Sequence, residues 1–322
     1  MKPNPLPFQE QLRGFSRALF STWLYHRRFN LLFDAGEGVA TSLLNRVFGI
    51  RKILLSHGHA DHIAGLTNLI NIRNLGAGDQ TAELTIYYPR NNALVELIRN
   101  YLSQTQNELS FNLIWKALDA DERIDLDQKN GKTYLKTFRT QHSQKQLSLG
   151  FNIIESRRRL LPEYSGKSQE EINQAIWKVG KDAVAEPFDQ IIFTYGGDSR
   201  PIQPALVRGT LLLCHECTYL CIDDDERNFQ QHSILSDVLE TARQAEVKVL
   251  LLFHLSLRYS LDEIRETIGE AARRMKLPFR IFILHGDRLF DPLDTYSRRK
   301  NRNDEDEAAA EFPVHFREEG AL

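Results

Sequence analysis

The stretch His57-Gly58-His59-Ala60-Asp61-His62 decides how this chain is interpreted. It directly follows the apolar run 52–56, which predicts a short buried strand. Burying three imidazoles and a carboxylate without partners is costly, whereas a loop at a strand end can direct them towards a cation. Imidazole and carboxylate ligands suit Zn²⁺, and they suit Mn²⁺ or Fe²⁺ less tightly. The stretch therefore favours a metal site over a polar surface turn that merely contains histidines.

Three further ionisable residues each lie just past an apolar run, in the same sense along the chain. They are His142, Asp198 and His254. A single histidine at a strand end is more often structural. Three such ends, together with the 57–62 stretch, favour a site with enough ligands for two cations.

Apolar runs bounded by turn signals alternate with helical periodicity. We expect strands at residues 19–24, 30–34, 52–56, 84–88, 134–140, 190–195, 210–215, 247–254 and 279–285, and helices at residues 65–75, 92–103, 169–179, 233–245 and 260–275. Ser233 and Ser260 are predicted to be N-cap residues, the latter in a capping box with Glu263. Sheets with helices outside and reactive residues at strand ends indicate an α/β sandwich.

Composition excludes some classes of function. The net charge of -2 over 322 residues gives no general attraction to nucleic acid, so an RNA site would need a local basic patch. Cys214, Cys217 and Cys221 are too few for a disulfide framework, and ordinary packing is favoured over a thiolate site. The N-terminus has no secretory apolar segment, and no apolar run is long enough to span a bilayer. We expect a cytoplasmic protein without membrane association.

Several motifs, in this order along the chain, resemble those of the metallo-β-lactamase superfamily and, within it, ribonuclease Z, the tRNA 3′-processing endonuclease. The 57–62 stretch alone specifies the superfamily. The narrower resemblance comes from LFDAGEG at 32–38, YGGDSRP at 195–201, HECT at 215–218, QHS at 231–233 and HLSLRY at 254–259. It covers about residues 16 to 290. It implies an αββα sandwich of two mixed sheets with helices outside, in one hydrolase domain over residues 1–296.

The resemblance also implies the ligands of two divalent metal ions, with zinc expected and Mn²⁺ or Fe²⁺ as alternatives. One ion would be bound by His57, His59 and His142, the other by Asp61, His62 and His254, with Asp198 bridging them. A bridging carboxylate makes chemical sense because it offsets the repulsion of two close cations. Asp34 is expected to orient a ligand imidazole by a hydrogen bond, or else to be an ordinary turn residue.

The implied reaction is phosphodiester hydrolysis by a hydroxide, formed when a water between the two metals loses a proton. Asp61 would orient this nucleophile or accept the proton of the water. His232 would be the general acid for the leaving 3′-oxygen, with Glu216 holding and polarising it. Arg258, Ser256 and Ser199 are candidate phosphate contacts. Arg200 is consistent with a phosphate contact and equally consistent with a structural salt bridge.

The chain departs from the family pattern in three places, and the third bears on the substrate. The glycine-threonine-glycine segment is replaced by Gly14-Phe15-Ser16-Arg17, and HECT replaces HEAT. The interval between His142 and Asp198 looks short for a tRNA-binding arm and lacks a Gly-Pro pair, so residues 155–185 are expected to form a reduced or differently built arm. Its basic residues indicate either a phosphate-contacting surface or a solvated connection. They are Arg157, Arg158, Arg159, Lys167, Lys178 and Lys181.

The leading hypothesis is an endoribonuclease that cleaves the 3′ trailer of precursor tRNA, with RNA as partner and a homodimer as the family's common state. The alternative is a small-molecule metallo-hydrolase acting on a phosphodiester, thioester or lactone. A binding role that retains the site is a third reading, and the full ligand set argues against it. Residues 297–322 are expected to be a charged, exposed or disordered C-terminal tail.

Overall fold

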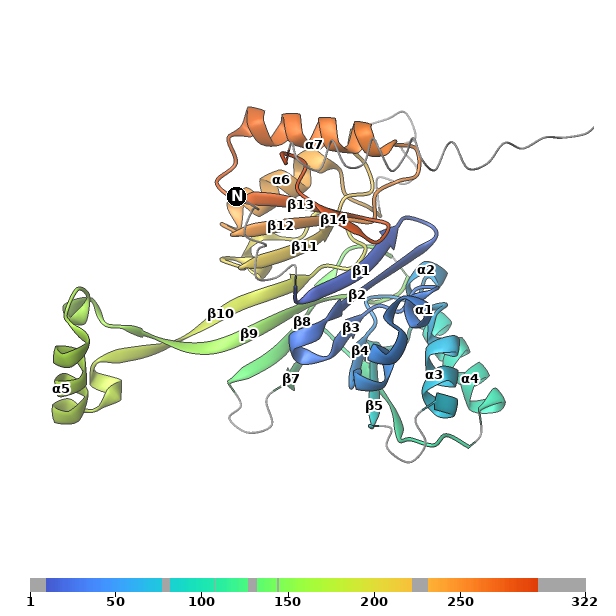
Figure 1. Ribbon diagram of the computed structural model, residues 1–322, viewed down its shortest axis with the longest axis horizontal. Helices are drawn as coiled ribbons and strands as arrows, with labels where there is room; N and C mark the ends of the chain where they lie inside the picture. The colour runs from blue at the N-terminus through green and yellow to red at the C-terminus, as the bar shows by residue number, and fades with distance from the viewer. Residues whose placement is uncertain are drawn as a thin grey trace, which may run out of the picture.

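A computed structural model describes residues 10–76, 82–106, 108–126, 132–143, 145–221 and 231–294. Two β-sheets pack face to face, and helices cover the outer face of each (Figure 1). The predicted αββα sandwich is confirmed. The predicted tail at 297–322 lies outside the described residues.

The first sheet has the order β1-β2-β3-β4-β5-β6, formed by Leu12–Arg17, Ser21–His26, Leu31–Phe33, Lys52–Leu54, Leu84–Pro89 and Leu113–Leu118. Its β1–β3 part is antiparallel and its β3–β6 part is parallel. The second sheet has the order β14-β13-β12-β11-β10-β9-β8-β7. In chain order its strands are β7 Arg123–Asp125, β8 Thr133–Thr140, β9 Ser148–Leu160, β10 Ala185–Tyr195, β11 Leu212–Glu216, β12 Val249–Phe253, β13 Arg280–His285 and β14 Arg288–Phe290. Strands β10 to β13 are parallel and the others antiparallel, so both sheets are mixed.

Three apolar clusters hold the layers together. One lies between the sheets and includes Phe33, Phe151 and Phe193. A second lies between the first sheet and the helices α1 Val39–Leu43, α2 Ala60–Ile63, α3 Leu66–Gly76 and α4 Ala93–Thr105. The third joins the second sheet to α6 Leu235–Gln244 and α7 Leu261–Met275. Fully burying one such side chain stabilises the fold by about 2 kcal/mol, so the sandwich gives its edge loops a rigid base.

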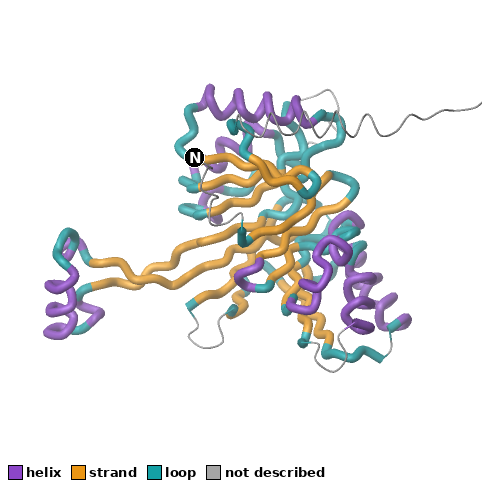
Figure 2. Tube along the Cα trace, in the orientation of Figure 1, coloured by secondary structure: helices purple, strands orange, loops and turns teal. Residues whose placement is uncertain are grey.

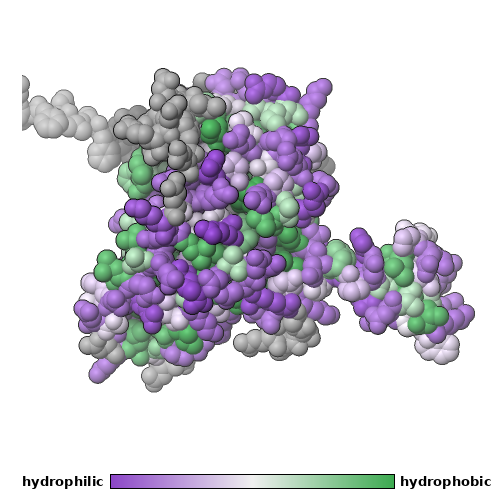
Figure 3. All heavy atoms as spheres, turned by 180° about the vertical axis from the view of Figure 1, so that it is seen from behind, coloured by the Kyte–Doolittle hydropathy of each residue, from purple (hydrophilic) through white to green (hydrophobic). Residues whose placement is uncertain are grey.

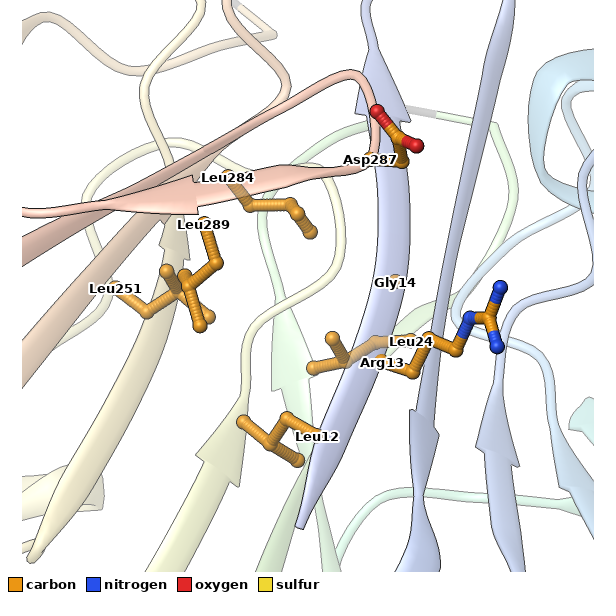
Figure 4. A pocket seen from close by; sticks show the side chains of 8 residues that line it. All are labelled: Leu12, Arg13, Gly14, Leu24, Leu251, Leu284, Asp287 and Leu289. Atoms are coloured by element: carbon orange, nitrogen blue, oxygen red, sulfur yellow. The ribbon is translucent and has the colours of Figure 1, made fainter. Parts of the chain in front are cut away.

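Strand β1 connects the two sheets at one edge. The N–H and C=O of Ser16 bond to Gly286 at 3.0 Å in each direction. Gly14 permits this approach, because a Cβ there would lie 2.7 Å from Leu24 and 2.9 Å from Leu284. A cavity of about 330 Å³ lies beside this contact, where leucines from both sheets face one another and Arg13 turns away (Figure 4).

Strands β9 and β10 extend beyond the sandwich as an antiparallel hairpin that carries α5 Gln169–Val179 at its tip (Figures 1 and 2). The register runs as far as Leu160 opposite Ala185. The structure therefore builds residues 155–185, which we call the arm, as a continuous hairpin rather than a loose connection. The Arg157–Arg159 run lies within β9.

The predicted strands and helices differ from the observed ones in several places. Residues 19–24 were expected to form a strand, but the strand is β2, two residues later, because residues 18–20 form a turn. Strands β1, β6, β7, β9 and β14 were not predicted. The Ser260 capping box is confirmed. The Ser233 cap is wrong: the N-cap is Ile234, since the Ser233 hydroxyl donates to the Ser199 carbonyl instead. Among the described residues, no helix is long and apolar enough to cross a membrane.

Candidate metal centre

The predicted ligands meet at one end of the sandwich, in segments that follow strands of both sheets. They come from the loop after β4, from α2, and from the ends of β8, β10 and β12. Their donor atoms fall into groups with all atoms within 4.8 Å of one another: His57, His59 and His142; His57, His62 and Asp198; Asp61, His62 and His254. Two of these groups are the two ligand sets implied by the sequence.

Asp198 lies between the two sets. Its Oδ2 is 3.3 Å from Nε2 of His62 and 3.2 Å from Nε2 of His254. The same oxygen is 3.8 Å from Nε2 of His57, which belongs to the other set. The carboxylate thus has the position that a bridging ligand requires.

Asp34 is completely buried and accepts four hydrogen bonds. Its Oδ2 accepts from Nδ1 of His62 and from the hydroxyl of Tyr195, each at 2.7 Å. Ser56 donates its N–H to Oδ1 at 2.7 Å and its hydroxyl to Oδ2 at 2.8 Å. Because the Nδ1 proton of His62 is held by Asp34, its Nε2 presents a lone pair to the site.

The other imidazoles are oriented in the same way. Since the Ser56 hydroxyl donates to Asp34, it can only accept from Nδ1 of His57, 3.0 Å away. His142 Nδ1 donates to the backbone carbonyl of Gln231 at 3.0 Å. Each Nε2 is left as a metal donor. Nδ1 of His59 faces Nε2 of His142 at 3.1 Å, as two ligands of one ion would.

Three buried donor atoms of the cluster are directed at the place where a cation would bind. Nε2 of His57 and of His62 and Oδ1 of Asp198 are buried without a hydrogen-bond partner among the described residues. Burial and the neighbouring His62 hold the pKa of His57 well below its ordinary value. The pKa of Asp198 is well below its ordinary value, because the imidazoles of His254 and His62 outweigh the effect of burial. Burial lowers the pKa of His62, but Asp198 and Asp34 raise it well above its ordinary value, so a divalent metal would replace a proton on that ring. Buried imidazoles around a carboxylate fit such a metal.

His232 and Glu216 form a buried pair beside this cluster. His232 Nδ1 donates to Glu216 Oε1 at 2.9 Å. Burial alone would lower the pKa of His232, but the Glu216 carboxylate raises it to about 9. The imidazole is therefore protonated at neutral pH, as a general acid must be.

Glu216 accepts further hydrogen bonds that fix its carboxylate. Oε2 accepts the N–H and the hydroxyl of Thr218, each at 2.8 Å. Oε1 accepts the N–H groups of Ser199 and Ser233 at 3.2 and 3.1 Å. Because the Thr218 hydroxyl donates to Glu216, it accepts from Nδ1 of His254 at 3.1 Å. Thr218 thus links the Glu216–His232 pair to a candidate metal ligand.

The candidate phosphate contacts lie in different surroundings. Ser199 is fully buried, and its N–H serves Glu216. Ser256 is half-buried, and Arg258 is exposed with its guanidinium 5.3 Å from the ring centre of Tyr219. Arg200 is also exposed, and its N–H donates to the carbonyl of Gln141. Only Ser256 and Arg258 combine accessibility with a place in the His254 loop.

Sequence reasoning missed three residues that orient the site. They are Ser56, Tyr195 and Thr218. Ser56 directly precedes His57, and the other two belong to the quoted motifs at 195–201 and 215–218, yet no role was assigned to them. The cysteines take no part in the centre. Cys214 and Cys217 pack in different apolar clusters, where burial raises their pKa, and Cys221 is exposed.

Comparison with known proteins agrees with this arrangement. A family model described as "Anti-Pycsar protein Apyc1" matches residues 14–183, which include the 57–62 stretch and His142. The chain belongs to this family. The match spans more than half of the 322 residues.

A ribonuclease Z from Thermococcus gammatolerans is 29% identical over 259 residues, which are 72% of this chain and 77% of that protein. Among solved structures, the metallo-β-lactamase fold protein YhfI from Bacillus subtilis has a TM-score of 0.59 at 16% identity, covering 87% of this chain and 98% of that one. The short form of human tRNase Z has a TM-score of 0.55 at 19% identity, covering 88% and 99%. The fold is that of the metallo-β-lactamases, and the predicted similarity to ribonuclease Z is confirmed.

Proposed function

We propose that this protein is a metal-dependent phosphodiesterase that cleaves RNA, with the 3′ trailer of precursor tRNA as its substrate. The observation that carries the proposal is the candidate metal centre with the hydrogen-bonded His232–Glu216 pair directly beside it. Asp198 lies between two ligand sets, and His232 lies beside them with Glu216 behind it. Phosphodiester hydrolysis needs both an activated water and an acid for the leaving oxygen.

We further propose two ions, with zinc as the native metal, bound by the two ligand sets and bridged by Asp198. The donors are mainly imidazoles with a few carboxylates, which is the set that Zn²⁺ prefers. When bound, such ions supply a nucleophilic water at neutral pH and neutralise charge on the phosphoryl oxygens.

The residues of the chain divide the remaining work. Asp34 fixes the ring of His62, and Asp61 orients the attacking water or accepts its proton. The Nδ1–H of His232 donates a hydrogen bond to Glu216, which directs the other nitrogen, Nε2, towards the substrate. The leaving 3′-oxygen takes its proton from Nε2–H. Ser256 and Arg258 position the phosphate, with Ser199 a lesser candidate because it is buried.

The choice of tRNA rests on the ribonuclease Z similarity and on the arm, which offers a surface away from the centre. We propose that this arm contacts the substrate and that the protein acts in the cytoplasm as a homodimer. The free thiols of Cys214 and Cys217 agree with a reducing compartment.

The test is cleavage of an end-labelled precursor tRNA with a 3′ trailer, in Zn²⁺ or Mn²⁺ and in chelator, beside an activated phosphodiester. We expect metal-dependent cleavage at the discriminator base. Turnover of the activated phosphodiester alone would contradict the tRNA assignment and retain the phosphodiesterase.

A small phosphodiester is the second candidate substrate. One observation favours it: the family that matches residues 14–183 is described by an anti-Pycsar protein and not by a tRNA nuclease. Salt separates the two candidates, because cleavage of a large RNA through many phosphate contacts weakens steeply as salt rises and turnover of a small substrate does not.

A further inference from the structure

The turn between β1 and β2 exposes two large apolar side chains. Leu19 is 84% exposed and Phe20 is 61% exposed. The turn closes by a hydrogen bond from the N–H of Phe20 to the carbonyl of Arg17 at 3.1 Å, and Leu19 has a φ of 71°. A left-handed conformation is unfavourable for leucine, and neither side chain gains burial from it. Packing against the part of the chain that the structure describes therefore does not account for the two residues.

Hydrogen bonds fix one side of the turn to the loop that carries His254. The backbone N–H of His254 donates to the hydroxyl of Ser16 at 2.9 Å. The N–H of Ala18 donates to the carbonyl of Leu255, the next residue, at 3.3 Å. The turn thus starts beside a candidate metal ligand.

The other side of the turn adjoins the helix that carries Asp61. The Ser21 hydroxyl donates to the carbonyl of Glu37 at 2.8 Å, and the N–H of Gly36 donates to the carbonyl of Thr22. A Cβ on Gly36 would meet both the Asp61 carbonyl and the Ser21 hydroxyl, so these two groups border the same point. Figure 1 shows the turn as the dark blue loop close to α2.

Leu19 and Phe20 are consequently anchored between the loops of two candidate ligands while their side chains stay open to solvent. Leu75, at the end of α3, is an exposed leucine on an outer helix. Leu94, which adjoins Gly58, and Leu257, in the loop after His254, also lie near the centre, but they are only 43% and 37% exposed. Leu19 and Phe20 combine a place next to the candidate ligands with greater exposure than Leu94 and Leu257.

We propose that Leu19 and Phe20 form a platform on which the nucleobase next to the scissile phosphate stacks. The proposal rests on the phosphodiesterase function and adds a contact for the base. The backbone bonds place the turn next to the loops of two candidate ligands. We therefore expect a nucleotide whose phosphate lies at the metal centre to bring its base to the turn. An aromatic ring supported by an aliphatic side chain binds any base through its π-face. Stacking needs no charged group, so Leu19 and Phe20 can make this contact with uncharged side chains.

The experiment combines protein variants with matched substrates. The substrates are a precursor tRNA and a diribonucleotide, each prepared intact and with an abasic residue on one side of the scissile phosphate. The proteins are wild type, Phe20→Ala, Leu19→Ala, Phe20→Trp and the exposed-leucine control Leu75→Ala. For each combination kcat/KM is measured with metal, and Kd is measured by fluorescence anisotropy.

For Phe20→Ala we expect a loss of about tenfold in kcat/KM and in affinity on the intact substrate, and little loss on the substrate abasic at the stacked position. Leu19→Ala should give a smaller loss with the same pattern, Phe20→Trp should restore wild-type values, and Leu75→Ala should change nothing.

Equal losses on intact and abasic substrates would overturn the platform, as would equal binding of both by wild type. A changed molar mass in light scattering for Phe20→Ala would instead identify the turn as a protein contact. Failure of the phosphodiesterase function is distinguishable, because wild type would then cleave none of the substrates, and the Kd values would still decide on the platform.

Discussion

The metal centre and the arm use ionisable residues in opposite ways. In the centre, Asp34 and Asp198 are buried and surrounded by imidazoles and hydroxyl donors. In the arm, the arginines of β9 lie near the surface in ion pairs with neighbouring carboxylates. These pairs are Arg157 with Glu155, Arg158 with Asp182 and Arg159 with Glu186.

The difference shows that side chains are positioned more firmly in the centre than in the arm. A buried charge without a partner is strongly unfavourable, so each member of the centre is held by several contacts. An exposed ion pair contributes about 0–1 kcal/mol and can exchange partners easily. The arm carries six basic and five acidic residues between 155 and 185, so it is nearly neutral. Its most exposed large apolar side chain is Trp177, 87% exposed, which belongs to the isolated tip seen in Figure 3.

Asp198→Ala should break the centre most severely. If Asp198 bridges two metal ions as proposed, its removal deprives both of a ligand, so we expect activity to fall at least about 1,000-fold. Metal content, measured by mass spectrometry of the purified protein, should fall as well. Asp121→Ala, which removes an exposed carboxylate, is the control. Full metal occupancy in Asp198→Ala would refute the bridging assignment.

His232→Ala should lower kcat by about 100-fold and leave the metal bound. The pKa of about 9 predicts that wild-type kcat/KM falls as pH rises through 9, because the acid is then deprotonated. The variant should lack this decline in a pH profile from 6 to 10.5. Loss of metal in the variant would mean that His232 is a ligand or a structural residue.

His26 sharpens the comparison, because it is buried without the carboxylate partners of His62. Burial, with the charge of Arg28, lowers its pKa to about 4, and its ring lies against Phe29 and Phe193. A depressed folded-state pKa contributes stability that is present above the unfolded value of about 6.5 and is lost as pH falls towards 4. At pH 5 the loss should be about 2 kcal/mol.

Urea unfolding of wild type and His26→Leu at pH 7.5 and 5 measures this loss. The difference between the two proteins isolates His26 from the other histidines. Identical pH dependence in both proteins would show that His26 is not the group responsible.

Shortening the arm should have the smallest effect on chemistry. Leu160 pairs with Ala185, so replacing residues 161–184 by Asn-Gly closes the hairpin with a two-residue turn. We expect KM for precursor tRNA to rise about tenfold, since lost contacts worth about 1.4 kcal/mol correspond to that factor. Turnover of an activated phosphodiester should be unchanged. Unchanged KM for precursor tRNA would contradict a role for the arm in binding.

The sequence predicted the centre better than it predicted the arm, and the reason lies in the type of signal. Four candidate ligands lie within the six residues 57–62, and the others directly follow apolar strands, so local pattern was sufficient. The outer part of β9 contains Arg157, Arg158 and Arg159, which do not alternate with apolar residues. Its strand conformation comes from pairing with β10, where Arg159 lies opposite Glu186.

The same distinction explains Ser233 and the turn at residues 18–20. Ser233 has the right residue type for an N-cap, but its hydroxyl finds the Ser199 carbonyl, which comes from a distant part of the chain. The run 19–24 is apolar, so a strand from Leu19 was a reasonable expectation. Strand β1 was unrecognised, and its pairing with β2 places the turn at Leu19 and Phe20.

By itself, the sequence determined the sandwich architecture, the candidate ligand residues and the order of the motifs, because hydrophobic periodicity and short motifs are local properties. The tertiary structure decided which residues orient those ligands, since Ser56, Tyr195 and Thr218 act through hydrogen bonds between separate strands. It also decided that residues 155–185 project as an arm and that Leu19 and Phe20 adjoin the centre. Contacts between segments far apart in the chain set these features, and no local pattern encodes them.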